Sequence, residues 1–206
     1  MTETAKRIDK LDGRRLRAEQ SRDAIVDALM ALLREGNPRP GARDIATRAG
    51  VSLRSVFRHF EDLDALFSVV AEKQTARTRH LFELQPTSGS LAQRVRALVE
   101  QRATLFEEIA PMRRAALRLA AFHAPIRRRL GEANAVLRRP LAAVFAAELA
   151  GLAAADCRDV LQAVDAATSF AFWETLRGDQ KLSVERSKRI VERTVRALVE
   201  PAASRV

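Results

Sequence analysis

Apolar residues recur along the chain at the spacing of one face of an α-helix. Within residues 18–34, Ile25, Leu29, Leu32 and Leu33 fall at i, i+4, i+7 and i+8, which places them on a single helical face. The same kind of spacing predicts further helices at residues 42–49, 53–59, 62–84, 91–109, 111–124, 125–151, 156–177 and 183–200. No stretch alternates with the period of a β-strand. The pattern predicts an all-α fold of about nine helices.

Prolines and glycines divide this helical pattern into parts. "EGNPRPG" at residues 35–41 ends the first helix, because two prolines and two glycines cannot continue it. Pro111 and Pro125 are each expected to open a helix at its first turn, and Pro140 is expected to kink one. "QPTSGS" at residues 85–90 is the clearest change of composition. We therefore expect a flexible basic arm at residues 1–17, a first domain at 18–84 and a second at 85–206.

The two shortest predicted helices meet at a tight turn. The first turns Ile45 and Ala46 inward, and Gly50 follows it where the chain must reverse, a position suited to a residue that adopts positive φ. Ser52 is a good N-cap for the second helix, because its hydroxyl can accept a backbone N–H. That helix buries Val56 and leaves its other side chains outside. The layout predicts a helix-turn-helix, in which the second helix projects a polar, basic face.

Charge sharpens this interpretation. Five arginines lie between Arg39 and Arg58, and the chain has a formal net charge of +10, which favours a polyanionic partner. Residues 1–84 hold 16 Lys and Arg against 13 Asp and Glu, whereas residues 85–206 hold 20 against 13. The local arrangement, rather than the total charge, therefore indicates double-stranded DNA.

The geometry of DNA assigns roles to these side chains. The major groove admits one α-helix, whose N-terminal residues reach base edges. Arg54 can donate two hydrogen bonds to a guanine, and Leu53 can contact a thymine methyl group. Arg43, His59 and the arginines of the arm would hold phosphates.

The stretch "ARDIATRAGVSLRSVFRHFEDLDALFSVV", with its flanking helices, resembles the DNA-binding domain of TetR-type (tetracycline-repressor-like) transcriptional regulators over residues 18–70. The resemblance implies a DNA-reading domain at residues 1–84 and a ligand-binding and dimerisation domain at 85–206. It also implies a cytoplasmic, nucleoid-associated bacterial repressor that a small molecule releases from a pseudo-palindromic operator. Together with the capping Ser52, the residues that it places at DNA are Arg43, Leu53, Arg54, Ser55, Phe57, Arg58 and His59.

Two residues depart from the pattern of that family. Phe57 stands where the family usually has a tyrosine, so a hydrogen bond to a phosphate is missing there. Leu63 stands at a position often held by a phosphate-binding lysine, within the acidic stretch "EDLD". Both departures should weaken nonspecific affinity and leave more of it to the arginines.

The last two predicted helices are candidates for a homodimer contact, since a single helix-turn-helix contacts too few base pairs to select a site. Two-fold pairing would space two such units about 34–36 Å apart, one turn of DNA. Apolar and small residues run along one face of each helix, and burial in the chain's own core is the alternative reading. The predicted interface residues are Val160, Val164, Ala167, Ala171, Val184, Val191, Val195 and Leu198.

A small-molecule effector is expected between the composition break and those helices. The candidate pocket residues are Phe106, Met112, Arg118, Leu119, Phe122, His123, Phe170 and Trp173. One of Arg113, Arg114 and Arg118 would pair with an anionic ligand. The alternative is that these arginines, like the triplet 127–129, form a solvated outer face.

Other function classes find less support. The only cysteine, Cys157, cannot form an intrachain disulfide, and no apolar run approaches the ~18–20 residues of a membrane span. The N-terminus lacks the apolar segment of a signal peptide. No catalytic, metal or cofactor constellation is found among the three histidines or at Glu107–Glu108, so no enzyme activity and no cofactor are expected. The alternatives left open are a DNA-binding regulator without an effector and, more remotely, a protein that binds RNA or an anionic membrane surface.

Overall fold

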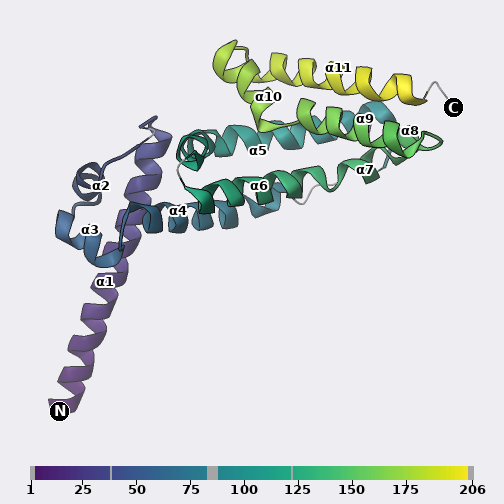
Figure 1. Cartoon of the computed structure of the whole chain (residues 1–206). Coiled ribbons are helices and arrows are strands. Elements are labelled where there is room, and N and C mark those ends of the chain that lie inside the picture. The colour runs from purple at the N-terminus through teal and green to yellow at the C-terminus, as the bar shows by residue number, and fades with distance from the viewer. Residues whose placement is uncertain (1–2, 38, 83–87, 122, 204–206) are drawn as a thin grey trace. The chain divides into compact units, whose positions relative to one another are not determined.

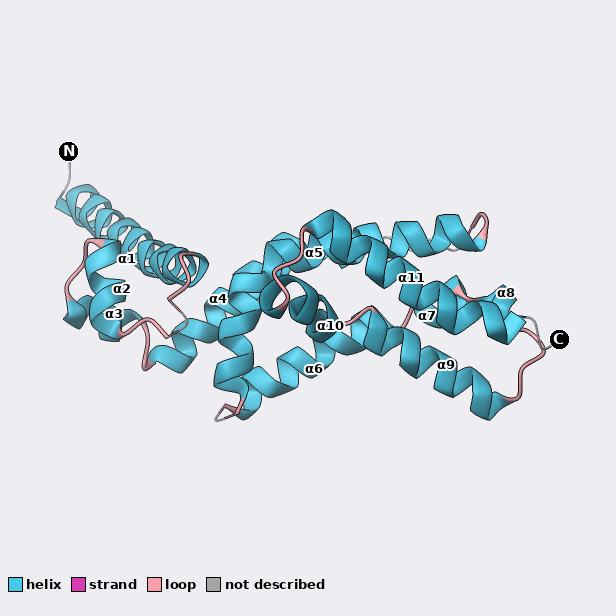
Figure 2. Ribbon diagram, turned by 90° about the horizontal axis from the view of Figure 1, so that it is seen from above, coloured by secondary structure: helices cyan, strands magenta, loops and turns pink. Residues whose placement is uncertain are grey.

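The computed structural model describes residues 3–37, 39–82, 88–121 and 123–203, and across these residues the chain consists of helices and loops (Figure 2). This confirms the prediction of an all-α fold with about nine helices. By its contacts the chain divides into a head unit, residues 1–77 with 111–126, and a body unit, residues 78–110 with 127–206. The predicted boundary at residues 84 and 85 lies outside the described residues.

The head unit contains α1 (Glu3–Arg34), α2 (Ala42–Ala49), α3 (Leu53–His59), most of α4 (Leu63–Thr78) and the end of α5 (Leu91–Ala120). The short helices α2 and α3 pack against α1 (Figure 1). The predicted apolar face of α1 forms the centre of this core, since Ile25, Leu29 and Leu33 are at most 2% exposed. These side chains pack with buried residues of α2, α3 and α4.

The body unit contains the rest of the chain. Its elements are the 3₁₀ turn η1 (Arg79–Phe82), the first two thirds of α5, most of α6 (Ala124–Arg138), α7 (Leu141–Val144), α8 (Ala146–Leu149), α9 (Ala154–Ala167), α10 (Phe170–Glu174), the π-helical turn η2 (Thr175–Asp179) and α11 (Val184–Ala203). The last helix, α11, packs against α8 and α9 (Figure 2). The predicted kink at Pro140 is present, because α6 ends at Arg138 and α7 starts after the proline.

Three elements differ from the sequence prediction. The arm expected to be flexible at residues 1–17 is helical from Glu3 onward, continuous with α1. Pro111, expected to open a helix, lies inside the 30-residue α5. An interior proline removes one helical hydrogen bond and costs about 3 kcal/mol. Residues on both sides of it are buried, Ile109 and Ala110 in the body core, Ala115 and Leu119 in the head core, and this burial offsets the cost.

The third difference is a break in the helix predicted at residues 156–177. It forms α9, α10 and η2, with an interruption at Thr168 and Ser169. The Thr168 hydroxyl donates to the Val164 carbonyl at 2.8 Å, and the Ser169 hydroxyl accepts the Phe172 N–H at 3.2 Å. Hydroxyl groups that bond the backbone in this way compete with the continuous helical ladder, so the chain restarts as α10.

Candidate nucleic-acid interface

The turn between α2 and α3 has the geometry that the sequence predicts. Gly50 adopts φ 65° and ψ 30°, the left-handed conformation that costs a residue with a Cβ about 1–2 kcal/mol. Its N–H bonds the Thr47 carbonyl at 3.2 Å, and the next N–H, of Val51, bonds the Ala46 carbonyl at 3.0 Å. These two bonds satisfy carbonyls at the end of α2 and fix the direction in which α3 leaves the turn.

Ser52 caps α3, as predicted. Its hydroxyl oxygen accepts the backbone N–H of Ser55 at 3.1 Å and lies 3.0 Å from the Ser55 hydroxyl. Such a cap stabilises a helix by typically ~1 kcal/mol, which matters for a helix of only seven residues. Both serines are therefore engaged in local structure.

The helix α3 has one buried side and one exposed side. Val56 is 1% exposed and lies in the head core, whereas Leu53 is 37% and Phe57 50% exposed. Arg54 and Arg58 are exposed beside them. The exposed side chains of Leu53 and Phe57 thus share one surface of α3 with Arg54 and Arg58, and neither Leu53 nor Phe57 belongs to the head core.

The basic side chains around the turn fall into two groups. Within the described part of the chain, Arg43, Arg54 and Arg58 are exposed and form no hydrogen bond or ion pair. Arg48, in contrast, pairs with both carboxylate oxygens of Glu35, one of them at 3.0 Å. Arg48 therefore braces α2 against the end of α1, and the other three arginines remain available to an outside partner.

His59 lies at the end of α3, and its Nε2 atom is buried with no hydrogen-bond partner among the described residues. Its burial, together with the charges of Arg58 and Arg22, lowers the pKa of the imidazole from the ordinary 6.5. The ring is therefore neutral at pH 7. Its predicted role as a phosphate contact has no support from charge, although His59 lies next to the exposed arginines.

We expect this histidine to make the protein less stable in mild acid. The unfolded chain binds a proton near pH 6.5, before the folded chain does, so the free energy of unfolding falls as pH drops below that value. Urea denaturation between pH 7.5 and 5 should show a weaker pH dependence in His59→Gln than in the wild type. His80→Gln controls for the loss of an exposed histidine. Equal pH dependence of His59→Gln and wild type would contradict the expectation.

The start of α4 explains the departure at Leu63. Asp62 accepts the backbone N–H of Ala65 through Oδ1 at 2.7 Å and so caps the helix. Leu63 is half-buried against the head core. This position therefore contributes packing, where a lysine would contribute charge.

The predicted pocket residues that the structure describes are divided between the two units. Met112 and Leu119 pack in the head core, and Arg118 is exposed. His123 Nδ1 lies 2.8 Å from Asp64 Oδ2, within the head unit. Phe122 lies outside the described residues.

The other three predicted pocket residues meet in the body core. Phe106 packs edge-on against Phe170, with ring centroids 5.6 Å apart, and its centroid lies 6.5 Å from that of Trp173. A small cleft beside them, open to solvent on one side, has no room inside for a water molecule. Its lining includes Arg102, a residue absent from the sequence prediction.

Half of the predicted dimer residues are enclosed by the chain's own core. Val164, Ala167, Val191 and Val195 are at most 6% exposed. Val160, Val184 and Leu198 are half-buried against the same core, and Ala171 is exposed. These apolar faces are therefore largely buried within a single chain. Helical spacing alone does not distinguish a face that packs within its own chain from one that packs against a second copy.

The head is a helix-turn-helix carried by an all-helical chain, and two solved structures share this fold. One is a crystal structure of a transcriptional regulator from Rhodococcus sp. Rha1, with a TM-score of 0.65 and 18% identity, covering 90% of this chain and 97% of that one. The other is a proposed transcriptional regulator from Pseudomonas aeruginosa PAO1, with a TM-score of 0.63 and 23% identity, covering 91% and 94%. No protein-family model and no curated protein matches the sequence.

The described residues also offer no membrane span and no metal-ligand cluster. No helix there has the length and apolar character required to cross a membrane. No group of three or more His, Cys, Asp or Glu side chains there is arranged to hold a metal ion.

Proposed function

We propose that the chain is a sequence-specific, double-stranded-DNA-binding transcriptional regulator of the TetR type, acting through the head unit. The observation that carries the proposal is the exposed face of α3, where Leu53, Arg54, Phe57 and Arg58 project from a helix anchored by Val56. The fold shared with two transcriptional regulators supports it. In this role the protein works in the bacterial cytoplasm, on the nucleoid.

Each exposed side chain has a task in the proposed complex. Arg54, in the first turn of α3, donates two hydrogen bonds to the O6 and N7 atoms of a guanine, and Leu53 contacts a thymine methyl group. Arg43 and Arg58 bind phosphates on either side and fix the register. Phe57 supplies apolar contact with the DNA, without the hydrogen bond that a tyrosine would donate.

A mobility-shift titration with the DNA that flanks the protein's own gene tests this function. Binding to that DNA should exceed binding to a scrambled duplex of equal length and composition by at least about 10³-fold. The logarithm of the association constant should fall linearly with the logarithm of salt concentration, with a slope of roughly −0.9 per phosphate neutralised. Equal affinity for both duplexes would reject sequence-specific recognition.

We further propose that the regulator is a repressor released by a small molecule bound in the body unit. Such a ligand must bind one conformation more tightly than another, and it then shifts the population of DNA-competent heads. The aromatic cluster of Phe106, Phe170 and Trp173 is the proposed site. A regulator that answers to no effector is the second candidate, and the same titration with and without ligand separates the two.

We expect the functional unit to be a homodimer, because a pseudo-palindromic operator requires two heads related by a two-fold axis. The proposed contact uses α9, α10 and α11, through Ala171 of α10 and the half-buried Val160, Val184 and Leu198. Light scattering after gel filtration should give about twice the chain mass of 22.9 kDa. A monomer at micromolar concentration, in the presence and absence of operator DNA, would contradict this mechanism.

A further inference from the structure

Two buried arginines lie on one face of α5, eight residues apart. Arg94 is 6% and Arg102 2% exposed, and both belong to the body unit. Eight residues make about 2.2 turns of an α-helix, so the two side chains leave roughly the same side of the helix. They differ in what surrounds them.

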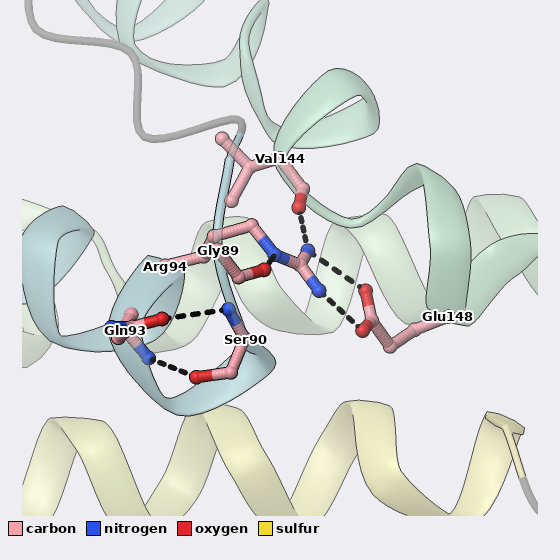
Figure 3. A network of polar contacts seen from close by, with 6 residues as sticks. All are labelled: Gly89, Ser90, Gln93, Arg94, Val144 and Glu148. Atoms are coloured by element: carbon pink, nitrogen blue, oxygen red, sulfur yellow. Dashed lines mark hydrogen bonds and ion pairs between the residues drawn. The ribbon is translucent and has the colours of Figure 1, made fainter.

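Arg94 has a carboxylate of its own. Its two terminal nitrogens pair with the two oxygens of Glu148 at 2.5 and 3.0 Å, and its Nε donates to the Gly89 carbonyl at 3.2 Å (Figure 3). It also donates to the carbonyl of Val144. Burial is tolerated here because charge and hydrogen bonds are both matched within the chain.

Arg102 has no such partner. One terminal nitrogen donates to the Leu137 carbonyl, and its Nε is buried with no acceptor within the described residues. Burial lowers the pKa of this guanidinium to about 10, and Asp165 is the nearest source of negative charge. That carboxylate is taken by Arg138, whose Nε lies 2.7 Å from it. At neutral pH the body core therefore contains a cation without a carboxylate.

Arg102 is one of the residues that line the cleft described above. Around it the walls are apolar, made by Val99, Phe106, Ala167, Trp173 and Val191. The other polar side-chain groups of the lining residues are the hydroxyls of Thr168 and Ser169, whose hydrogens go to backbone carbonyls at 2.8 Å each, and the indole N–H of Trp173, which donates to Glu107 at 2.9 Å. Several apolar side chains of the cleft thus lie beside a buried positive charge that has no carboxylate partner among the described residues, and the lining residues include no second cation.

We propose that this cleft binds a small monocarboxylate with an apolar body, whose carboxylate pairs with Arg102 as Glu148 pairs with Arg94. A phosphate ester is a poorer match, because its two negative charges and three free oxygens would find only one cation and no free hydroxyl donor. An uncharged ligand would leave Arg102 as it is. The proposal deepens the proposed function by naming the class of effector, but the binding itself involves no DNA.

The wall of the cleft includes two departures from a regular α-helix. The helix is interrupted at Thr168–Ser169 on one side of Trp173, and the π-helical turn η2 begins two residues after Trp173 on the other. Interruptions and π-turns of this kind occur frequently at functional sites. Because the cleft as it stands holds no water molecule, ligand entry requires this α10 segment to move outward.

Trp173 makes the proposal directly measurable, since it is the only tryptophan of the chain and lines the cleft. The probes are acetate, hexanoate, benzoate and phenylacetate, each with its primary amide. At least one carboxylate should titrate the Trp173 fluorescence to saturation, and its amide should bind roughly 10- to 150-fold more weakly, the range for a hydrogen bond to a charged group. At a hundred times its Kd it should raise the melting temperature by about 5–10 °C.

Variants test whether Arg102 is the residue that causes the preference for carboxylate over amide. Arg102→Met should abolish the preference for carboxylate over amide, and Arg102→Lys should keep part of it. Arg128→Gln removes an equal charge from an exposed residue of the same unit and should leave the preference unchanged. If Arg102→Met does not fold, the wild-type comparison of acid with amide still decides.

Two results would overturn the proposal: no carboxylate in the series binds more tightly than its amide, or the preference survives in Arg102→Met. Loss of operator binding in the mobility-shift titration would reject the proposed function and leave this result standing. Conversely, operator binding without any carboxylate effect would reject the carboxylate site alone.

Discussion

Replacing Glu148 with glutamine is expected to lower the free energy of unfolding by about 3–5 kcal/mol, the usual cost of breaking a buried ion pair from one side. For a chain of this size that corresponds to a fall of roughly 6–20 °C in melting temperature. Glu148 and Arg94 are 8% and 6% exposed, so water cannot replace the lost carboxylate. Thermal unfolding followed by circular dichroism at pH 7 measures the change.

The ion pair of Arg94 and Glu148 should also make the stability difference between wild type and Glu148→Gln depend on pH. Its hydrogen bonds to Arg94 are the main cause that lowers the pKa of Glu148 below the ordinary 4.5. A depressed carboxyl pKa contributes stability above pH 4.5, and this contribution is lost as pH falls through the folded-state value. The gap between wild type and Glu148→Gln should therefore narrow in acid.

Matched variants separate charge pairing from the mere loss of a carboxylate. Glu132 lies 3.8 Å from Arg128 in an exposed pair of the same unit, and Glu132→Gln should change the stability by less than about 1 kcal/mol. The double variant Arg94→Met, Glu148→Met removes both charges together and should recover most of the loss. Equal effects of Glu148→Gln and Glu132→Gln would show that the buried pair does not stabilise the body unit.

The parts of the fold that the sequence predicts are those set by neighbours along the chain. The positive φ at Gly50, the cap at Ser52 and the inward Val56 all follow from residue type and a spacing of a few positions. The same holds for the apolar face of α1. In these places local preference and tertiary packing favour the same structure, so a pattern is sufficient to find it.

Elements that depend on contacts between residues far apart in the sequence cannot be predicted from such local patterns. Pro111 should start a helix by local rules, but burial on both sides keeps it inside α5. The break at Thr168 depends on where two hydroxyls find carbonyls. The spacing of Val164 and Val195 predicts a buried face, but hydrophobic spacing does not show whether the same chain or a second copy covers that face.

The candidate effector site includes Arg102, which the sequence prediction lacks although its position in the chain is informative. Arg94 and Arg102 fall within the apolar stripe of α5, close to Val95, Leu98 and Val99. A charged residue at a core position must find a partner or a ligand, so this spacing alone singles out both arginines. Phe106, Phe170 and Trp173 stand out as pocket candidates because aromatic residues make up only 5% of the sequence.

The second large effect is expected at the DNA-reading face. Arg54→Ala should raise the Kd for operator DNA by about 5- to 150-fold, that is ~1–3 kcal/mol, and should relax the choice of base at one position of each half-site. Arg54 is exposed and bonds to nothing within the described chain, so its removal should leave the melting temperature unchanged. The measurement is a competitive mobility-shift assay over single-base variants of the operator.

Two other arginine variants serve as comparisons for Arg54→Ala. Arg58→Ala removes a proposed phosphate contact from the same helix, so affinity should fall for every duplex alike, and the salt dependence should weaken by about one phosphate. Arg128→Ala removes an exposed arginine of the body unit and should affect neither. If Arg54→Ala weakened binding to all duplexes equally, Arg54 would hold a phosphate, and another side chain of α3 would have to read the base. If it weakened none, α3 would not lie in the groove, because a helix inserted there brings its first-turn arginine within reach of the bases.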